Sequence, residues 1–369
     1  MVNKEYIIER TIAFKAAVLN FGDSLKYDDE NTCIVEGDSL ELIKKIPDNC
    51  ISLILTDPPY HSTKKGNITN DTAFQNDEAF IKWIESYSIE WKRVLRPNGS
   101  LFVFCSSSMS GKIEAILGGR FNVLSHIVWT KPNDPGFDGW KQKMKKETLR
   151  QWYAHSERIL FAEPCEDGNL FRSSLGNFLR QKRLESGLSG HQLTEMIKAY
   201  GKVNHGGAVS NWEAGRNIPN REQYEKICNA LISSRIGLTM PPYEDIVRPF
   251  FVDSTVEFTD VWNFNSVRPY NHKHPAEKPI DMLEHCIATS TYENDIILDC
   301  FAGSGSTAFA ATNLKRKSIV IELEAKWVNL IVNRMQQYDR EHYGSIVKKH
   351  GLKKVPKESL NDHATLSLF

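Results

Sequence analysis

A short segment with acidic, proline and aromatic residues, Asp57-Pro58-Pro59-Tyr60, directly follows the apolar segment Ile51–Thr56. Because proline has no backbone N–H, the polar groups of this loop are mainly acceptors, namely carbonyl oxygens and the carboxylate of Asp57. Acceptors beside the ring of Tyr60 could hold and polarise an NH₂ group on a planar ring. The segment therefore indicates a site for an aromatic amine. The alternative is a turn that ends a strand, with Asp57 capping a helix.

A glycine-rich segment, Asp299–Thr307, forms a second candidate site. Gly303 and Gly305 lie between an apolar segment and a predicted helix, where they allow a tight turn and close approach of a ligand. The start of the helix offers free N–H groups, and without a following Gly-Lys-Ser/Thr the segment is not a P-loop. Glu322 ends the next apolar segment, the usual place for an acceptor of ribose hydroxyls. An ordinary strand-to-helix turn is the alternative, but together with Glu322 the glycines predict a nucleoside-type cofactor site.

Two further segments carry weaker signals. Asp38 follows an apolar segment, and its carboxylate could accept from an adenine amine, cap the helix predicted over Ser39–Lys45, or do both. The segment His274–Pro279 (HPAEKP) precedes a predicted helix, Ile280–Thr289. Taken alone, this second pattern favours a helix start initiated by proline, with Lys278 in solvent.

The candidate sites follow short, uniformly apolar segments, which are typical of strands covered on both faces. Helical patterns lie between several of these segments, at Ser39–Lys45, Glu78–Leu95 and Thr307–Asn313, and Pro97-Asn98-Gly99 is predicted to stop the second helix. This alternation predicts an α/β fold, a doubly wound, mostly parallel, seven-stranded Rossmann-like sheet with its ligand crevice at the carboxyl ends of the strands. The predicted strands are Thr32–Glu36, Ile51–Thr56, Ser100–Cys105, Leu124–Trp129, Arg158–Ala162, Asp295–Cys300 and Ser318–Glu322.

Residues 170–235 differ from the rest, because they contain amphipathic helical patterns and no strand pattern. These patterns cover Leu175–Arg183, Ser189–Ala199 and Arg221–Ile232. A chain of 369 residues is long enough for about two domains, so we expect a small all-α domain inserted into the sheet domain. The expected parts are an N-terminal segment (1–30), the two halves of the sheet domain (31–169 and 268–342), the helical insert (170–235), an irregular connector (236–267) and a mobile tail (343–369).

The composition excludes several classes of protein. A hydrophobic content of 41% with 25% charged residues is typical of soluble globular proteins, and no apolar run approaches the roughly 20 residues that span a bilayer. Seven cysteines without a C-x-x-C pair argue against a zinc site and a disulfide framework, and fit a reducing cytoplasm. We therefore expect a cytoplasmic protein without a membrane anchor or metal. The 46 basic and 46 acidic residues give zero net charge, which by itself argues against a nucleic-acid partner.

As a set, these motifs resemble the amino-methyltransferase family of bacterial and phage DNA methyltransferases. The order, with DPPY first and the glycine-rich loop last, resembles the permuted β subgroup of that family. The resemblance covers about residues 31–165 and 268–340, and Trp129-Thr130-Lys131 and His155–Arg158 resemble later strand motifs. Ser156 departs from the pattern, because the family often has His and Glu adjacent there. The motifs that carry the resemblance are Asp57–Tyr60 (DPPY), Phe301–Gly305 (FAGSG), Ile321–Glu324 (IELE) and His274–Pro279 (HPAEKP).

The resemblance implies S-adenosylmethionine (SAM) as the cofactor. Glu322 would bind the ribose hydroxyls, Asp38 the adenine amine, and His274–Pro279 would support the methionine end. The residues that would line the cofactor are Asp38, Ser39, Asp57, Lys278, Pro279, Asp299, Phe301, Ala302, Gly303, Ser304, Gly305, Ser306, Thr307, Glu322 and Leu323.

The activity that the resemblance implies is sequence-specific methyl transfer to the N6 amino group of an adenine flipped out of duplex DNA. Asp57 and the carbonyl of Pro58 would accept from the amine, Pro59 would complete the acceptor loop, and Tyr60 would stack on the base. The family uses Asp-Pro-Pro-Tyr mostly for adenine N6 and Ser-Pro-Pro-Tyr mostly for cytosine N4, so a cytosine-N4 enzyme is the alternative within the family. A non-catalytic SAM-binding regulator and an RNA methyltransferase are alternatives of other classes. A homodimer and a separate restriction endonuclease are compatible with the family.

The helical insert resembles a lambda-repressor-type helix-turn-helix, with a recognition helix at about Gly206–Ala214. Such a helix would read the target sequence in the major groove. A helical bundle that makes no DNA contact is the alternative. A basic segment around Lys141–Arg150 could bind phosphates of the flipped DNA, or form a solvated lysine-rich helix. The DNA-binding candidates are Lys131, Lys141, Lys145, Lys146, Asn204, His205, Ser210, Asn211 and Arg216.

The distribution of charge resolves the apparent conflict between zero net charge and a DNA partner. Between residues 176 and 233 the chain has eight Lys and Arg against five acidic residues. Asp38, Asp57, Glu322 and Glu324 lie in the predicted cofactor and amine sites instead. The neutral total thus averages a basic DNA-facing side with an acidic cofactor side.

Overall fold

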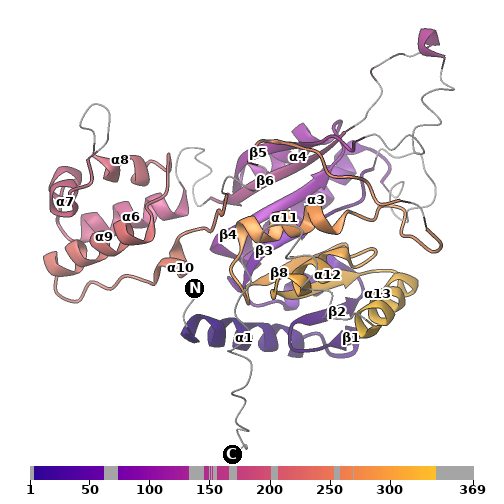
Figure 1. The fold of residues 1–369 in the computed structure, drawn as a ribbon, viewed down its shortest axis with the longest axis horizontal. Coiled ribbons are helices and arrows are strands. Elements are labelled where there is room, and N and C mark those ends of the chain that lie inside the picture. Colours follow the sequence, from indigo (N-terminus) through magenta and orange to yellow (C-terminus); the bar gives the residue numbers. More distant parts are fainter. Residues whose placement is uncertain are drawn as a thin grey trace, which may run out of the picture.

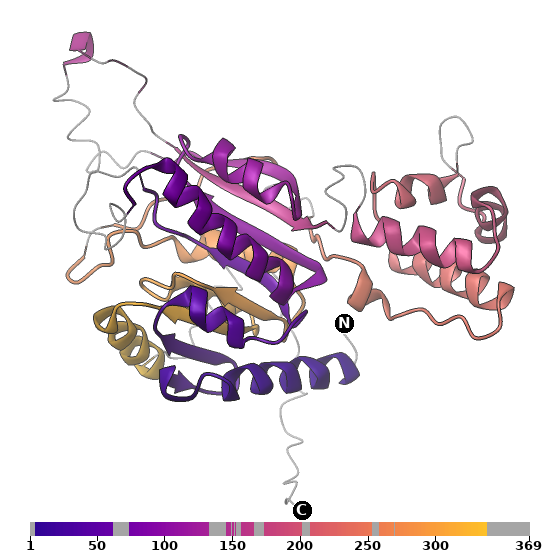
Figure 2. The same cartoon turned by 180° about the vertical axis from the view of Figure 1, so that it is seen from behind.

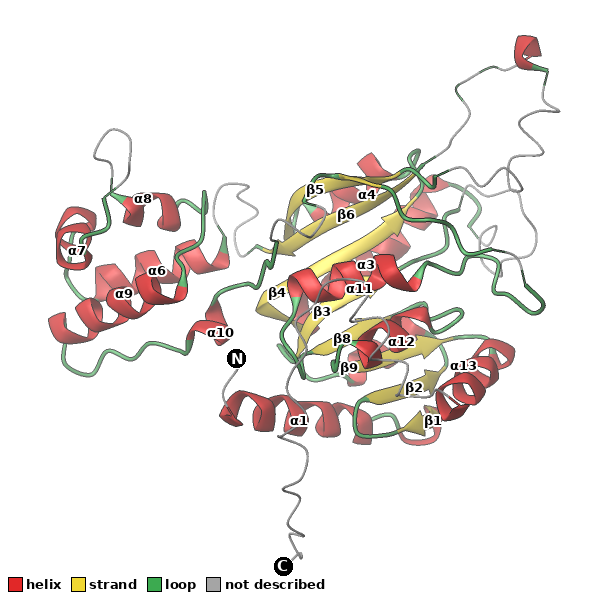
Figure 3. Cartoon of the chain, viewed as in Figure 1, coloured by secondary structure: helices red, strands yellow, loops and turns green. Residues whose placement is uncertain are grey.

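The computed structural model describes residues 4–61, 74–132, 145–148, 150, 152, 156–165, 173–200, 207–252, 258–268 and 270–337. Within these residues one sheet forms the centre of the molecule (Figures 1 and 3). Its strands are β1 (Leu25–Asp28), β2 (Thr32–Glu36), β3 (Ile51–Thr56), β4 (Leu95–Cys105), β5 (Phe121–Trp129), β6 (Glu157–Pro164), β7 (Val261–Trp262), β8 (Ile296–Asp299) and β9 (Lys317–Glu322). They are ordered β1-β2-β9-β8-β3-β4-β6-β5-β7. Five of the eight neighbouring pairs are parallel, and every antiparallel pair contains β1 or β6.

The prediction of seven strands is wrong, because the sheet has nine strands within the described residues alone. Each predicted segment forms a strand, and the two missed strands, β1 and β7, are the edges of the sheet. Residues of β1 alternate between half-buried and exposed, and β7 has only two residues. A search for uniformly apolar segments finds strands covered on both faces, and edge strands lack that pattern. The predicted helix stop Pro97-Asn98-Gly99 lies within β4, which begins directly where the preceding helix ends at Val94.

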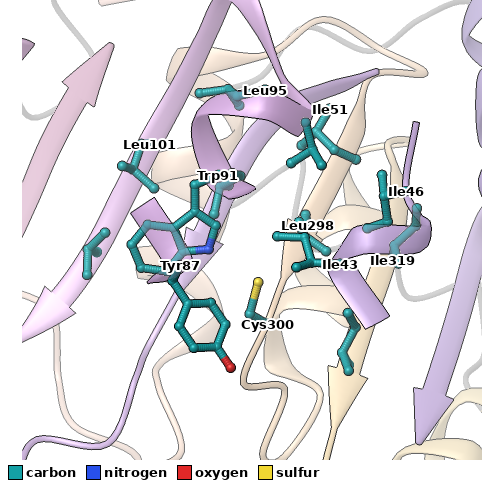
Figure 4. Packing of buried hydrophobic residues seen from close by; sticks show 14 of the residues in the cluster. Ile43, Ile46, Ile51, Tyr87, Trp91, Leu95, Leu101, Leu298, Cys300 and Ile319 are labelled. Carbon is teal, nitrogen blue, oxygen red and sulfur yellow. The ribbon is translucent and has the colours of Figure 1, made fainter. Parts of the chain in front are cut away.

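Helices cover both faces of the sheet, as Figure 1 and the reverse view in Figure 2 show. Successive strand residues point to opposite faces, so Ile54 packs in the layer of α1–α4, whereas Leu53 and Leu55 pack in the layer of α11 and α12. Figure 4 shows the first layer, where Tyr87 and Trp91 pack beside Leu298 and Cys300. The helices of the two layers are α1 (Lys4–Leu19), α2 (Ser39–Leu42), α3 (Asp77–Val94) and α4 (Ser110–Leu117) on one face, and α11 (Ile280–Ser290), α12 (Ser306–Asn313) and α13 (Ala325–Gln337) on the other.

The remaining helices form a separate helical unit, which we define as residues 173–247. It has its own hydrophobic core, which includes Leu179, Leu193, Trp212 and Leu231, and it lies to one side of the sheet (Figures 1 and 2). Capping boxes at Ser189 and Asn220 define the starts of α7 and α9. Its helices are α6 (Ser174–Glu185), α7 (Gly190–Ile197), α8 (Ala208–Glu213), α9 (Arg221–Ser234) and α10 (Tyr243–Ile246).

All seven cysteines are free thiols, and six of them are buried. Among the described helices, none is long and apolar enough to cross a membrane.

Candidate active site

A cavity of about 600 Å³ lies at the carboxyl ends of β3, β8 and β9. Because β3 pairs with β8, the loop after β3 and the glycine-rich loop after β8 become neighbours although they are distant in sequence. The hydroxyl of Thr56 donates to the carboxylate of Asp299 at 3.3 Å and joins the two loops. The expected cofactor residues that line the cavity are Asp38, Ser39, Asp57, Lys278, Asp299, Phe301, Ala302, Gly303, Ser304, Ser306, Thr307, Glu322 and Leu323.

Two expected cofactor residues do not line the cavity. Pro279 is the N-cap residue of α11. Gly305 precedes α12 with a φ of +79°, and a Cβ at this position would lie 2.7 Å from the side chain of Ile331.

At one end of the cavity, two carboxylates and two ammonium groups form a compact cluster. Nζ of Lys278 donates to Oδ2 of Asp57 at 2.5 Å and lies 3.6 Å from Oε2 of Glu157. The hydroxyl of Tyr60 donates to the same Glu157 oxygen at 2.7 Å, and Lys131 is paired with the other Glu157 oxygen. Oδ1 of Asp57 is buried and has no hydrogen-bond partner among the described residues. The cluster therefore leaves one carboxylate acceptor unused.

Burial and neighbouring charges shift the pKa values of this cluster. Burial raises the pKa of Asp57 above its ordinary value, and the ammonium of Lys278 opposes this rise. Burial also acts on Glu157, but Lys278 and Lys131 outweigh it and lower the pKa of Glu157 to about 2. Burial lowers the pKa of Lys278, but Asp57 and Glu157 raise it above its ordinary value. Lys278 therefore stays charged, and it is 8% exposed, which contradicts the interpretation that placed it in solvent.

The glycine-rich loop is held by the carboxylate of Glu322 and by His274. Oε2 of Glu322 accepts from the backbone N–H of Gly303 at 2.8 Å, and its other oxygen accepts from Glu324 at 2.9 Å. Gly303 has a φ of +53°, and a Cβ there would lie 2.9 Å from the ring of His274. That ring also packs edge-on against Trp327 at 4.6 Å. The HPAEKP segment and the loop therefore form one wall of the cavity.

Two other predicted acidic residues have structural partners as well. Oδ1 of Asp38 accepts from the N–H of Leu40 at 2.8 Å and caps α2, so the capping role is confirmed. The buried carboxylate of Asp299 accepts from Thr307 at 2.6 Å and from the N–H of Phe301 at 3.0 Å. Burial raises the pKa of Asp299 to about 6.

Three parts of the site were not found by sequence reasoning. Glu157 lies in the charged cluster, although Ser156 obscured its motif. Lys131, expected at DNA, has its ammonium on Glu157 in the cavity. The rings of Trp83 and Tyr87 contact Phe301 at 5.5 and 5.2 Å and line the cavity.

The other DNA-binding candidates fall in two segments of the chain, residues 141–146 and 204–216. Lys141, Asn204 and His205 lie outside the described residues, and Lys146 begins a 3-10 turn, Lys146–Thr148. Lys145 is exposed. In the helical unit, Ser210 and Arg216 are exposed and Asn211 is half-buried. No group of His, Cys, Asp and Glu in the described part of the chain has the arrangement of a metal site.

Comparison with known proteins relates this chain to DNA methylases. Residues 51–333 match the sequence model of the N6/N4 DNA methylase family. Type II methyltransferase M.BglII of Bacillus subtilis is 25% identical over 315 residues, covering 80% of this chain and 67% of that protein. DNA adenine methyltransferase YhdJ of Escherichia coli K12 is 23% identical over 330 residues, covering 88% and 90%. The solved structure of PvuII DNA methyltransferase, named as cytosine-N4-specific, shares the fold, with a TM-score of 0.51 at 17% identity over 89% of this chain and 96% of that one.

Proposed function

The chain belongs to the N6/N4 DNA methylase family, a SAM-dependent family, and on this premise we propose that it methylates the N6 amino group of adenine in duplex DNA. The observation that carries the proposal is Oδ1 of Asp57, a buried acceptor without a partner in the described residues, in the cavity that the glycine-rich loop also lines. A buried polar atom without a partner costs about 1–3 kcal/mol. An amino group on a base would supply the missing donor.

The acceptors around Asp57 suit the chemistry of an exocyclic amine. The lone pair of this nitrogen is delocalised into the ring, so the nitrogen is a poor nucleophile. Oδ1 of Asp57 and the carbonyl of Pro58 would accept from its two N–H groups, favour a tetrahedral nitrogen and stabilise the positive charge that develops on it. SAM, when bound, supplies a methyl group activated by a positively charged sulfur. The contribution of the protein is then mainly positioning and preorganised charge.

The charged cluster would position the two residues that contact the base. Lys278 fixes one oxygen of Asp57 and opposes the rise that burial causes in the pKa of Asp57, while the other oxygen stays available. Glu157 holds the hydroxyl of Tyr60 at 2.7 Å, which would orient the ring for stacking on a flipped base. Lys278 and Glu157 are therefore proposed as positioning residues.

The other end of the cavity fits a nucleoside cofactor. A Cβ at Gly303 would lie 2.9 Å from the ring of His274, so glycine at this position allows the loop to pack closely against the HPAEKP segment beside the cavity. A carboxylate offers about four lone-pair positions. Glu322 uses two of them on backbone N–H groups, and the others would accept from ribose hydroxyls. Asp38 uses Oδ1 as a cap, which leaves Oδ2 for an adenine amine.

Asp57 at the start of the acceptor loop supports adenine, since the resemblance associates this residue mostly with N6 methylation. A cytosine N4 amine carries the same two N–H donors, and the fold neighbour from the PvuII system is named as cytosine-N4-specific. Cytosine is therefore the second candidate base.

Methylation-sensitive long-read sequencing of DNA from cells expressing the protein would test the function. We expect N6-methyladenine within one short recognition sequence for the wild type and none for Asp57→Ala. N4-methylcytosine in such a sequence would replace the adenine assignment. The absence of any modified sequence, despite soluble protein that binds SAM, would contradict the proposed activity.

A further inference from the structure

The helical unit is attached at the far end of the sheet, which is formed by the start of β4 and the end of β6 and lies opposite the active site. Strand β6 runs antiparallel to β4, so Glu157 at its start lies in the active site and Pro164 at its end lies at the far end of the sheet. The helical unit begins at this far end, where the hydroxyl of Ser174 donates to the carbonyl of Pro164 at 3.0 Å. The 8 residues of β6, at about 3.3 Å each, separate the two points by about 25 Å.

Polar contacts hold the helical unit at the far end of the sheet. The amide of Asn98, near the start of β4, donates to the carbonyl of Glu244 in α10 at 2.9 Å. Asp245, the next residue, binds Arg10 of α1 at 2.9 Å and Arg96 of β4 at 2.7 Å. Bonds from α10 to two separate elements fix a direction as well as a position. The exposed surface of the unit therefore has a defined orientation relative to the sheet.

That surface carries cations that no carboxylate neutralises. Three of the five acidic residues between positions 176 and 233 form ion pairs with Lys or Arg within the unit, namely Glu185, Glu213 and Glu222, and a fourth, Glu195, lies 3.7 Å from His191. Among the described residues of the unit, Arg180, Lys198 and Arg216 are exposed and have no carboxylate partner. The excess positive charge is thus present at the surface and is complementary to a polyanion.

Two of these cations lie beside α8. Gly176 of α6 packs so closely on α8 that a Cβ there would lie 2.7 Å from the carbonyl of Glu213. Arg180 is one turn further along the same side of α6, which places it beside the end of α8. Arg216 follows α8 and donates to Oδ1 of Asn211 at 3.2 Å. Together with the exposed hydroxyl of Ser210, these groups can contact phosphates and base edges.

We propose that this surface, formed by Arg180, Ser210, Asn211 and Arg216, binds double-stranded DNA outside the sequence that enters the active site. DNA has a persistence length of about 50 nm, so it would be costly to bend one short recognition sequence so that it reaches both the active site and the helical unit at opposite ends of the sheet. The unit therefore binds flanking DNA or a second duplex, which differs from the expectation that the insert reads the target. The choice of DNA as the partner rests on the proposed function, whereas the location does not.

Binding of the full chain to two lengths of DNA would test this proposal. One duplex of about 14 base pairs, little more than a helical turn, carries the recognition sequence, and another of about 60 base pairs adds random flanks. Affinities are measured without cofactor, at about 0.1 M salt. Arg216→Glu and Arg180→Glu are compared with Lys226→Glu, which makes the same charge change on an exposed residue of α9. Figure 1 shows α6 between α9 and α8.

We expect Arg216→Glu and Arg180→Glu to weaken binding of the long duplex about tenfold, with a shallower salt dependence, and to change binding and methylation of the short duplex less than about twofold. Lys226→Glu should behave as the wild type on both. Equal losses on both duplexes, or a changed recognition sequence, would show that the unit reads the target and would overturn the proposal, as would unchanged binding of the long duplex. Melting curves for each variant exclude unfolding as the cause. If the wild type methylates neither duplex, the proposed function fails, while the ratio of the two affinities still tests the second surface.

Discussion

The ammonium nitrogen of Lys278 lies 2.5 Å from Oδ2 of Asp57, although 221 residues separate the two in sequence. Both side chains are largely buried. The contact binds one carboxylate oxygen and leaves Oδ1 without a partner in the described structure. The contact therefore joins the HPAEKP and DPPY motifs into one site, in which Oδ1 of Asp57 remains available as an acceptor.

Replacing Lys278 by Met should lower methyl transfer and change its pH dependence. Burial raises the pKa of Asp57, and Lys278 opposes the rise, so without the ammonium the pKa of Asp57 increases further. The acid limb of the kcat–pH profile should then move to higher pH, with a loss of about 100-fold at neutral pH. Lys278→Arg, which keeps the charge, should retain an acid limb close to that of the wild type. An unshifted limb in Lys278→Met would contradict the role of this contact.

Glu157→Gln and Tyr60→Phe should separate two roles of Glu157, namely accepting a hydrogen bond from Tyr60 and balancing the charges of Lys131 and Lys278. Tyr60→Phe removes only the hydroxyl that donates to Glu157 at 2.7 Å and keeps the stacking ring, so we expect a loss of less than about tenfold. Glu157→Gln also leaves the ammonium groups of Lys131 and Lys278 without their shared carboxylate, and should cost about tenfold more. Steady-state kinetics with a short duplex measure both. Equal effects would mean that Glu157 acts only through Tyr60.

Gly303→Ala should weaken SAM binding and destabilise the fold. The residue has a φ of +53°, and the new Cβ would lie 2.9 Å from the ring of His274, so strain and displacement should together cost about 1–3 kcal/mol. Gly111→Ala in α4 is the matched control, because a Cβ there meets nothing within 4 Å and alanine favours a helix by up to about 1 kcal/mol. Calorimetric titration with SAM and urea unfolding measure the two effects. Unaltered SAM affinity in Gly303→Ala would argue against contact between this loop and the cofactor.

His274 should make the protein less stable as the pH falls. Burial lowers the pKa of its imidazole to about 4, below the ordinary value of 6.5. Between these values the unfolded chain takes up a proton that the folded chain does not, so stability present above pH 6.5 is lost as the pH falls toward 4. The loss at pH 5 should be about 2 kcal/mol relative to pH 7.5. Urea unfolding at both pH values measures the free energy of unfolding. The decrease between pH 7.5 and pH 5 should be smaller by this amount in His274→Gln than in the wild type. Equal decreases in the two proteins would contradict the lowered pKa of His274.

Local patterns in the sequence located most of the site, because the chemistry depends on loops that directly follow strands. Asp57 and Asp299 could be placed at the ligand edge, since each ends a run that is uniformly apolar and therefore buried. Lys278 could not be placed in the same way, because a lysine before a helix is compatible with solvent. Glu157 was obscured for a similar reason, since its side-chain partners Tyr60, Lys131 and Lys278 come from three separate segments.

The sequence by itself determined the cores of seven strands, the starts of several helices, the acceptor loop and the glycine-rich loop, because each depends on the properties of neighbouring residues. Only the tertiary structure decided which oxygen of Asp57 is occupied, how Lys131, Lys278 and Glu157 share charge, and where the edge strands lie. It also decided the location of the helical unit. Its position in the sequence, between the two halves of the sheet domain, is compatible with a location either beside the active site or at the far end of the sheet. The antiparallel direction of β6 carries the chain about 25 Å away from the active site before the unit begins.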